Sequence, residues 1–95
     1  MAETRYDISD DAQVSALWAE LVRLRFDKNL EMEGTTPDDV RDMLSDIDWY
    51  KKRWEPGCQY DKNEIGFTPV AGRSGRWKTY MWRHEDENLI VLVVA

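Results

Sequence analysis

The apolar positions in the first third of the chain recur every three or four residues, which is the spacing of one helix face. Ser9 precedes this pattern as an N-cap, and Asp10 and Asp11 follow in the first turn, where carboxylates interact favourably with the helix dipole. The pattern predicts a helix over residues 10–28. Its stripe consists of Val14, Leu17, Trp18, Leu21, Leu24 and Arg25, with Val22 and Phe26 widening its apolar part.

Local start and stop signals predict a second helix over residues 36–55. Thr36 is an N-cap, Pro37 stands at the first helical position, and Asp39 can reach back as in a capping box. Pro56 and the glycine after it cannot continue the helix. Its predicted apolar face consists of Val40, Met43, Leu44, Ile47, Tyr50 and Trp54.

The second half of the chain changes to the period of two that β-strands have. Residues 65–70 contain Gly66 and Pro69, so they are predicted to form at best an edge strand. After a turn at residues 71–75, residues 76–84 alternate between two faces. One face carries Trp77, Thr79 and Met81, and the other carries Lys78, Tyr80, Trp82 and His84. Residues 85–88 form a polar hairpin turn, and the uncharged, β-branched segment 89–95 is predicted to lie at the centre of the sheet.

These elements predict one α+β domain over residues 1–95, with two helices packed on one face of a small antiparallel β-sheet that ends in a C-terminal hairpin. A strand as apolar as 89–95 is an aggregation hazard unless both of its edges are covered. Residues 4–8 can cover the free edge as a short first strand, or a second copy of the chain can cover it. The sequence supports both arrangements.

The charge is divided unevenly along the chain. Residues 1–49 hold five Lys/Arg and thirteen Asp/Glu, a balance of −8, whereas residues 50–95 hold eight and six, a balance of +2, which together give the net charge of −6. A strongly acidic half repels phosphates and disfavours direct nucleic-acid binding through that region. It favours a partner protein with a basic surface.

The acidic face of the second predicted helix is the first candidate binding surface. Asp38, Asp42 and Asp46 stand four residues apart, so each lies about 6 Å from the next on one face of a continuous helix. Trp49 falls far around that helix from the apolar stripe, either exposed among these charges as a binding hot spot or covered by residues 58–75. The candidate partner-binding residues are Asp38, Asp39, Asp42, Asp46, Asp48 and Trp49. A solvated helix face that aids solubility is the alternative interpretation.

Basic and aromatic residues interleave along the second predicted strand pair and offer an alternative nucleic-acid face. Such residues on a sheet can stack on bases and neutralise phosphates. In the ordinary alternative, Trp77 and Met81 pack on the helices while the opposite side chains form the outer face of the sheet. The candidate residues are Arg73, Arg76, Lys78, Tyr80, Trp82, Arg83 and His84.

The stretch Gly75-Arg76-Trp77-Lys78 through Arg83, with the closing run Leu89–Val94, resembles the last strands of the RelE/ParE toxin superfamily. The predicted order of strand, helix, helix and terminal sheet is also similar to that family. The resemblance implies a ribosome-dependent RNase in which Arg76, Lys78, Arg83 and His84 bind phosphate or act as acid–base groups. Those toxins are basic, whereas this chain carries a net charge of −6.

Support for catalysis or for a cofactor is thin in this composition. Cys58 and His84 are the single cysteine and histidine, so no zinc ligand set and no internal disulfide is expected. Residues 72–75 lack the spacing and the lysine of a phosphate-binding loop. The first residues have no apolar core of a signal peptide, and the longest apolar run is too short to span a membrane, so a cytoplasmic protein is expected.

Three functional hypotheses follow. The first is a small acidic inhibitor or adaptor that occludes a basic surface of a partner protein, as immunity proteins and phage anti-defence proteins of the anti-CRISPR kind do. The second is a nucleic-acid binder or RNA-cleaving toxin that works through the arginine and aromatic strand. The third is a structural subunit that forms a homodimer through the final strand.

Overall fold

The computed structural model describes residues 2–62 and 64–95, with the side chains of Ile47 and Lys51 also outside the description. The described chain forms four strands and three helices. The strands are β1 (Ala2–Asp7), β2 (Phe67–Arg73), β3 (Thr79–His84) and β4 (Leu89–Val94), and the helices are α1 (Asp11–Arg23), α2 (Pro37–Ser45) and α3 (Ile47–Arg53).

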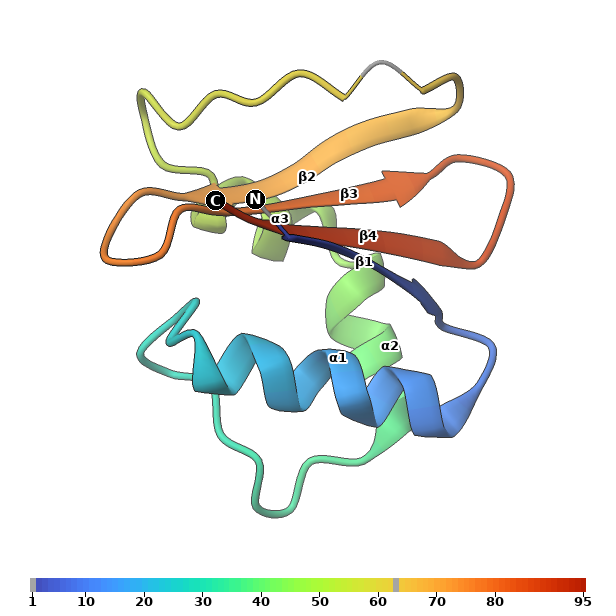
Figure 1. Cartoon of the computed structure of the whole chain (residues 1–95). Coiled ribbons are helices and arrows are strands. Elements are labelled where there is room, and N and C mark those ends of the chain that lie inside the picture. The colour runs from blue at the N-terminus through green and yellow to red at the C-terminus, as the bar shows by residue number, and fades with distance from the viewer. Residues whose placement is uncertain (1, 63) are drawn as a thin grey trace.

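The four strands form one antiparallel sheet in the order β1-β4-β3-β2. All three described helices lie on one face of this sheet (Figure 1). The predicted α+β class and the C-terminal hairpin of β3 and β4 are therefore confirmed. The main core fills the space between the two layers, where Leu17, Leu21, Leu44, Met81 and Ile90 are fully buried.

β4 occupies the centre of the sheet, as its uncharged sequence predicts. It pairs with β3 on one side and with β1 on the other, where Thr4 lies opposite Leu92 and Tyr6 opposite Ile90. The N-terminal segment, and not a second copy, thus covers the free edge of this strand. Both edges of β4 are therefore hydrogen-bonded within the chain, and of the two arrangements that the sequence supports, the structure shows the one in which the N-terminal segment covers this edge.

β2 is the edge strand that Pro69 predicts, but it is displaced along the chain. It begins at Phe67 and continues to Arg73 through most of the predicted turn, with a shift of register between Pro69 and Ala71. β3 begins only at Thr79. Trp77 and its neighbours therefore belong to the β2–β3 hairpin turn and not to the strand.

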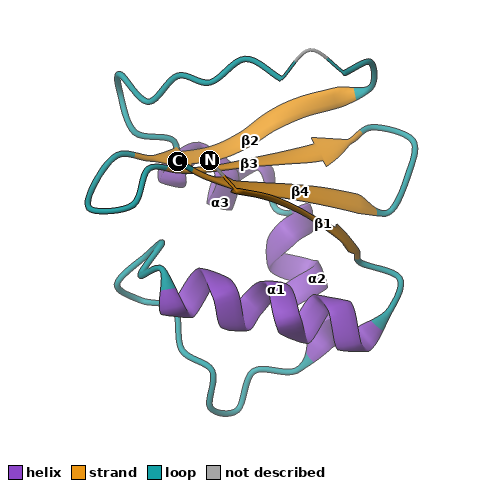
Figure 2. Cartoon of the chain, viewed as in Figure 1, coloured by secondary structure: helices purple, strands orange, loops and turns teal. Residues whose placement is uncertain are grey.

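The sheet face opposite the helices is covered by the chain itself. The connection from α3 to β2 runs across this face (Figure 2), and it places Cys58 and Tyr60 against Tyr80, Trp82 and Val91. The ring of Tyr60 lies 5.2 Å from that of Tyr80 and 5.0 Å from that of Trp82. Tyr80 and Trp82 lie on the sheet face opposite the helices, as predicted, but the long connection covers both rings.

α1 begins one residue later and ends five residues earlier than predicted. Asp10, not Ser9, is the N-cap, and its carboxylate accepts a hydrogen bond from the backbone of Ala12. At the other end Phe26 N–H bonds Leu21 C=O and Arg25 N–H bonds Val22 C=O, which is the Schellman arrangement. Arg25 has a φ of 51°, a left-handed conformation that stops the helix.

The second predicted helix is split at Asp46. The capping box of Thr36 and Asp39 and the position of Pro37 are confirmed, and α2 begins there. Asp46 has extended backbone, ends α2, and accepts a hydrogen bond from the backbone of Asp48 as the N-cap of α3. An aspartate can offer the backbone this alternative to a continuous helix, and the break turns Trp49 and Tyr50 into the core.

Candidate functional site

The predicted row of carboxylates does not exist as one helical face. Asp38 and Asp42 share a face of α2, but Asp46 stands at the break between helices and is used as a cap. Asp39 is held by the capping box, and Asp38 pairs with Arg41 at 2.9 Å. These aspartates and Asp48 are exposed, but several of them serve the local structure. The interpretation of the row as a continuous binding strip is therefore wrong.

Trp49 is not an exposed hot spot. Its side chain is 8% exposed and belongs to the main core. The ring stacks on Phe26 at 6.5 Å between centroids and meets Tyr50 edge-on at 5.4 Å. Trp49 is thus covered by the α1–α2 connection, which carries Phe26, whereas the sequence suggests cover by residues 58–75. The prediction of Trp49 as a contact residue is corrected, because a binding partner cannot reach a ring packed in the core.

The structure instead gathers carboxylates from three separate segments at one end of the molecule. The β1–α1 turn and the β3–β4 hairpin lie side by side there, joined by a 2.9 Å hydrogen bond from Ile8 N–H to Asn88 C=O (Figure 1). Arg41 brings α2 to the same place by bonding Ile8 C=O and the carboxylates of Asp11 and Asp38. We name the following set the acidic end: Asp7, Asp10, Asp11, Asp38, Asp42, Asp86 and Glu87.

A groove of about 390 Å³ opens within the acidic end, between the β1–α1 turn and the hairpin. Asp7, Asp86 and Glu87 line it together with Ser9 and Asn88. The Ser9 hydroxyl and backbone donate to Asp7, and these hydrogen bonds hold the pKa of Asp7 below its ordinary value. Among the described residues, Asp42, Asp86 and Glu87 have no cation within ion-pair distance.

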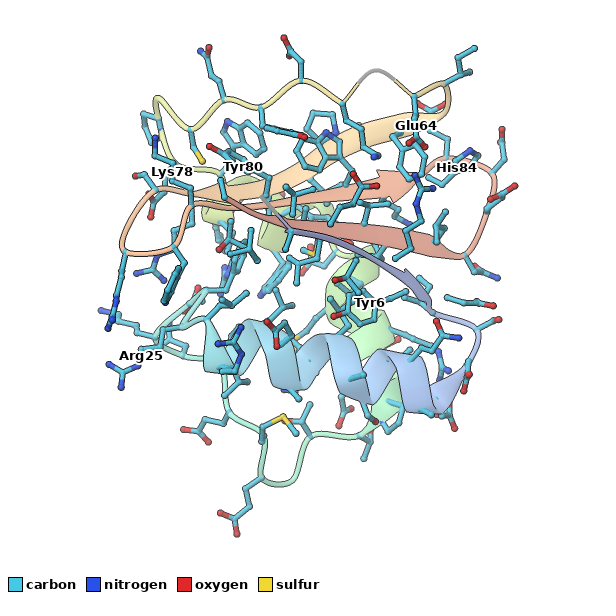
Figure 3. The ribbon with its side chains drawn as sticks, in the orientation of Figure 1. Tyr6, Arg25, Glu64, Lys78, Tyr80 and His84 are labelled. Carbon is cyan, nitrogen blue, oxygen red and sulfur yellow. The ribbon has the colours of Figure 1, made fainter. Side chains whose placement is uncertain are left out.

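His84 shapes the hairpin that carries two of these carboxylates. Its Nδ1 accepts 3.1 Å hydrogen bonds from the backbone N–H groups of Asp86 and Glu87. Its ring meets Phe67 edge-on at 5.0 Å, and a Cβ at position 66 would approach its Nε2 to 2.5 Å, so the chain needs Gly66 there. His84 (Figure 3) is thus engaged in supporting the acidic end.

The predicted arginine and aromatic strand does not form one nucleic-acid face. Trp82 is 2% exposed and cannot stack on a base. Arg83 points to the helical layer, where its guanidinium donates to Leu44 C=O at 2.9 Å. Lys78 stays exposed in the β2–β3 hairpin. Of this candidate set, the structure brings Arg73 and Arg76 together, and it places them in a different site.

That site is a cavity of about 480 Å³ at the opposite end from the carboxylates, between the C-terminal end of α1 and the β2–β3 hairpin. We name it the arginine cavity. In Figure 3, Arg25 and Lys78 mark this side of the molecule. The cavity is lined by Arg23, Leu24, Arg25, Arg73, Ser74, Gly75, Arg76 and Trp77.

Two of the four arginines are held by the protein and two are not. Arg23 pairs with Glu20, whose carboxyl pKa this lowers, and Arg73 lies 3.4 Å from Glu55 while donating to the carbonyls of Arg25 and Phe26. Arg25 and Arg76 are exposed and have no carboxylate within ion-pair distance among the described residues.

The sequence patterns do not place Arg23, Arg25 or Trp77 in one site. Arg25 falls within the predicted helix 10–28, and the alternation of residues 76–84 predicts that Trp77 lies on the helix-facing side of a strand. Its ring is in fact 46% exposed, with the Arg76 guanidinium 5.3 Å from its centroid. The cavity joins segments about fifty residues apart in sequence, and local patterns carry no signal for such a contact.

Cysteine and histidine side chains are catalytic in many enzymes, but Cys58 and His84 support the fold in this structure. Cys58 lies in the α3–β2 connection and is buried against the sheet, and this burial raises the pKa of its thiol, which makes it a weak nucleophile. Within the described ranges, His, Cys, Asp and Glu side chains do not gather in threes that could hold a metal ion. The described helices also include none with the length and apolar character to span a bilayer.

No family model, curated protein or solved structure matches this chain.

Proposed function

We propose that this chain is a binding protein and not an enzyme, and that it docks its acidic end on a basic surface of a partner protein. The observation that carries the proposal is the convergence of seven carboxylates from three chain segments at one end, where Arg41 is the described cation that pairs with two of them. Unneutralised charge gathered on one surface speeds encounter with a surface of opposite sign and selects against partners of like sign.

The groove within the acidic end supports a specific mode of docking. A lysine or arginine side chain of a partner can enter it and meet the carboxylates of Asp7, Asp86 and Glu87. The hydrogen bonds from the hairpin backbone to His84 fix the segment that carries two of these carboxylates. A rigid acceptor loses less conformational entropy on binding than a flexible one.

The class of partner follows from the same electrostatics. Proteins that hold nucleic acid present basic surfaces to phosphates, so a carboxylate surface can compete for them. Immunity proteins and phage anti-defence proteins of the anti-CRISPR kind inhibit their targets by such competition. We propose that this chain does the same in the cytoplasm. We include such inhibition in the proposal, with Asp42, Asp86 and Glu87 in place of Trp49 as the contact residues.

Charge reversal tests the proposal with a matched control. The variant D86K/E87K reverses two charges at the acidic end, whereas E31K/E33K makes the same change of net charge in the exposed α1–α2 connection. Proteins of the native host retained by the immobilised wild-type chain are identified, purified and titrated by calorimetry. We expect D86K/E87K to lose at least tenfold in affinity and E31K/E33K less than threefold. An equal loss of affinity in the two variants, or no loss in either, would contradict docking through the acidic end.

A further inference from the structure

We propose that the arginine cavity is a second binding site, which takes a phosphate group that carries an aromatic base. The source of this group is a free nucleotide or the terminal nucleotide of a single strand. The site lies at the end of the molecule opposite the acidic end, so it is independent of the docking surface proposed above. Its four guanidinium groups, its exposed indole and its volume each point to this ligand class.

The charges favour phosphate over a single carboxylate. Guanidinium groups donate in a planar fork that matches both anions, but a phosphate monoester carries more charge and more acceptor oxygens. Arg25 and Arg76 have no carboxylate within reach among the described residues, and Arg23 has one, Glu20. The two oxygens of one carboxylate cannot accept hydrogen bonds from all of these guanidinium groups. The oxygens of one phosphate can accept hydrogen bonds from two or more of them.

Arg73 places positive charge next to the C-terminal end of α1, which would otherwise disfavour an anion here. The C-terminal end of a helix carries partial negative charge on its last carbonyls. The guanidinium of Arg73 donates to the carbonyls of Arg25 and Phe26 just beyond α1, and its Nε lies 3.4 Å from Glu55. Arg73 is thus a positioning residue, because its bonds to these two carbonyls hold the backbone from which Arg25 projects.

Trp77 supplies the means to hold a base. Its ring is 46% exposed beside the arginines, and the guanidinium of Arg76 already lies over it. Base–aromatic stacking is tolerant of base identity, and an arginine plane can extend the stack. A volume of about 480 Å³ falls within the range of small-molecule sites, which supports one nucleotide and not an extended strand.

The backbone of Arg25 is an independent sign that its side chain is used. It stands at the helix-ending position with a φ of 51°, where glycine is the unstrained residue. A side chain at this position costs stability. An arginine that has a strained backbone, and no carboxylate partner among the described residues, fits a role in binding better than a role in folding.

Calorimetric titration with four probes tests the proposal: inorganic phosphate, AMP, a 5′-phosphorylated pentanucleotide RNA and hexaglutamate. We expect AMP to bind at least tenfold more tightly than inorganic phosphate, with hexaglutamate weaker than AMP. If the affinity for the pentanucleotide is within threefold of the affinity for AMP, the ligand is a free nucleotide. If the pentanucleotide binds more than tenfold more tightly than AMP, the ligand is the end of a strand. Tighter binding of hexaglutamate than of AMP, or no binding of AMP at 10 mM, would overturn the proposal.

Variants separate binding from folding. R25G removes the side chain while relieving the backbone, so it should fold at least as well as wild type and yet lose at least fivefold in AMP affinity. W77A should reduce AMP to the affinity of inorganic phosphate. The control R5A/K52A removes two charges from outside the cavity and should change AMP affinity less than twofold. Losses as large in this control as in R25G would mean that net charge, and not the cavity, binds the anion.

Discussion

The guanidinium of Arg53 lies over the indole ring of Trp49, with its central carbon 4.8 Å from the ring centroid. The same side chain places its Nε 2.7 Å from a carboxylate oxygen of Asp27, in an ion pair that is largely shielded from water. This contact fastens α3 to the α1–α2 connection and closes the core over Trp49. Trp49, which the helical pattern of residues 36–55 places among charged residues, is therefore one of the residues that hold the helical layer together.

The variant W49A should lower the free energy of unfolding by about 3–5 kcal/mol, because it empties the space that Phe26 and Tyr50 enclose. W77A, which truncates an exposed ring, should lower it by less than about 1 kcal/mol. Urea unfolding followed by circular dichroism measures both. Equal small effects in the two variants would show that Trp49 does not lie in the core.

R25G should raise the free energy of unfolding by about 1 kcal/mol relative to R25A, since alanine keeps the cost of a positive φ and glycine does not. The comparison with R25A cancels the loss of the arginine side chain itself. Thermal unfolding at low protein concentration gives the difference. If R25A were as stable as R25G, α1 would not end in the left-handed conformation described.

T36A should lower the free energy of unfolding by about 1 kcal/mol, because Asp39 N–H at the start of α2 loses the threonine oxygen that accepts its hydrogen bond. S45A changes an exposed hydroxyl at the other end of the same helix and serves as the control. Denaturant midpoints with unchanged slopes report the two effects. A loss with S45A that matched the loss with T36A would speak against the capping box.

Stability should fall between pH 10 and pH 12 because of Tyr50. Burial raises the pKa of its phenol from 10.0 to about 12, and the nearby charge of Arg83 offsets only part of that effect. Above pH 10 the unfolded chain loses this proton while the folded chain keeps it, so the stability contributed by the raised pKa is present below pH 10 and is lost as pH rises to 12.

The loss amounts to about 2–3 kcal/mol at pH 12, from about 1.4 kcal/mol for each unit of the shift. Y50F lacks the titrating group and should be at least as stable as wild type at pH 8, since the Tyr50 hydroxyl has no hydrogen-bond partner among the described residues. Urea titrations of both proteins between pH 8 and 12 provide the test. Parallel pH profiles for the two proteins would contradict the burial of this hydroxyl.

Local signals in the sequence predict the parts of the fold that local physics decides. Thr36, Pro37 and Asp39 set the start of α2 by themselves, and the uncharged run 89–94 sets the central strand. Asp46 does not by itself predict the break between α2 and α3, because an aspartate is compatible with both a helix interior and a cap. Only the packing of Trp49 and Tyr50 into the core selects the cap.

The candidate sites depend on contacts between distant segments, and these left little trace in the sequence. The division of charge into an acidic and a basic half predicts that two different surfaces exist. It does not predict that Asp7 meets Asp86 across a groove, or that Arg25 meets Arg76 across a cavity. Both juxtapositions follow from the sheet order, in which β1 pairs with β4 and the β2–β3 and β3–β4 hairpins point to opposite ends (Figure 1).

The most direct test of the docking surface is zero-length carbodiimide cross-linking of the native complex with a purified partner, followed by mass spectrometry. This reagent joins carboxylates to lysines that touch them. We predict cross-links from Asp7, Asp86 and Glu87 to lysines of the partner, and their loss at high salt. Cross-links confined to Glu31 and Glu33, in a complex that forms fully, would contradict docking through the acidic end.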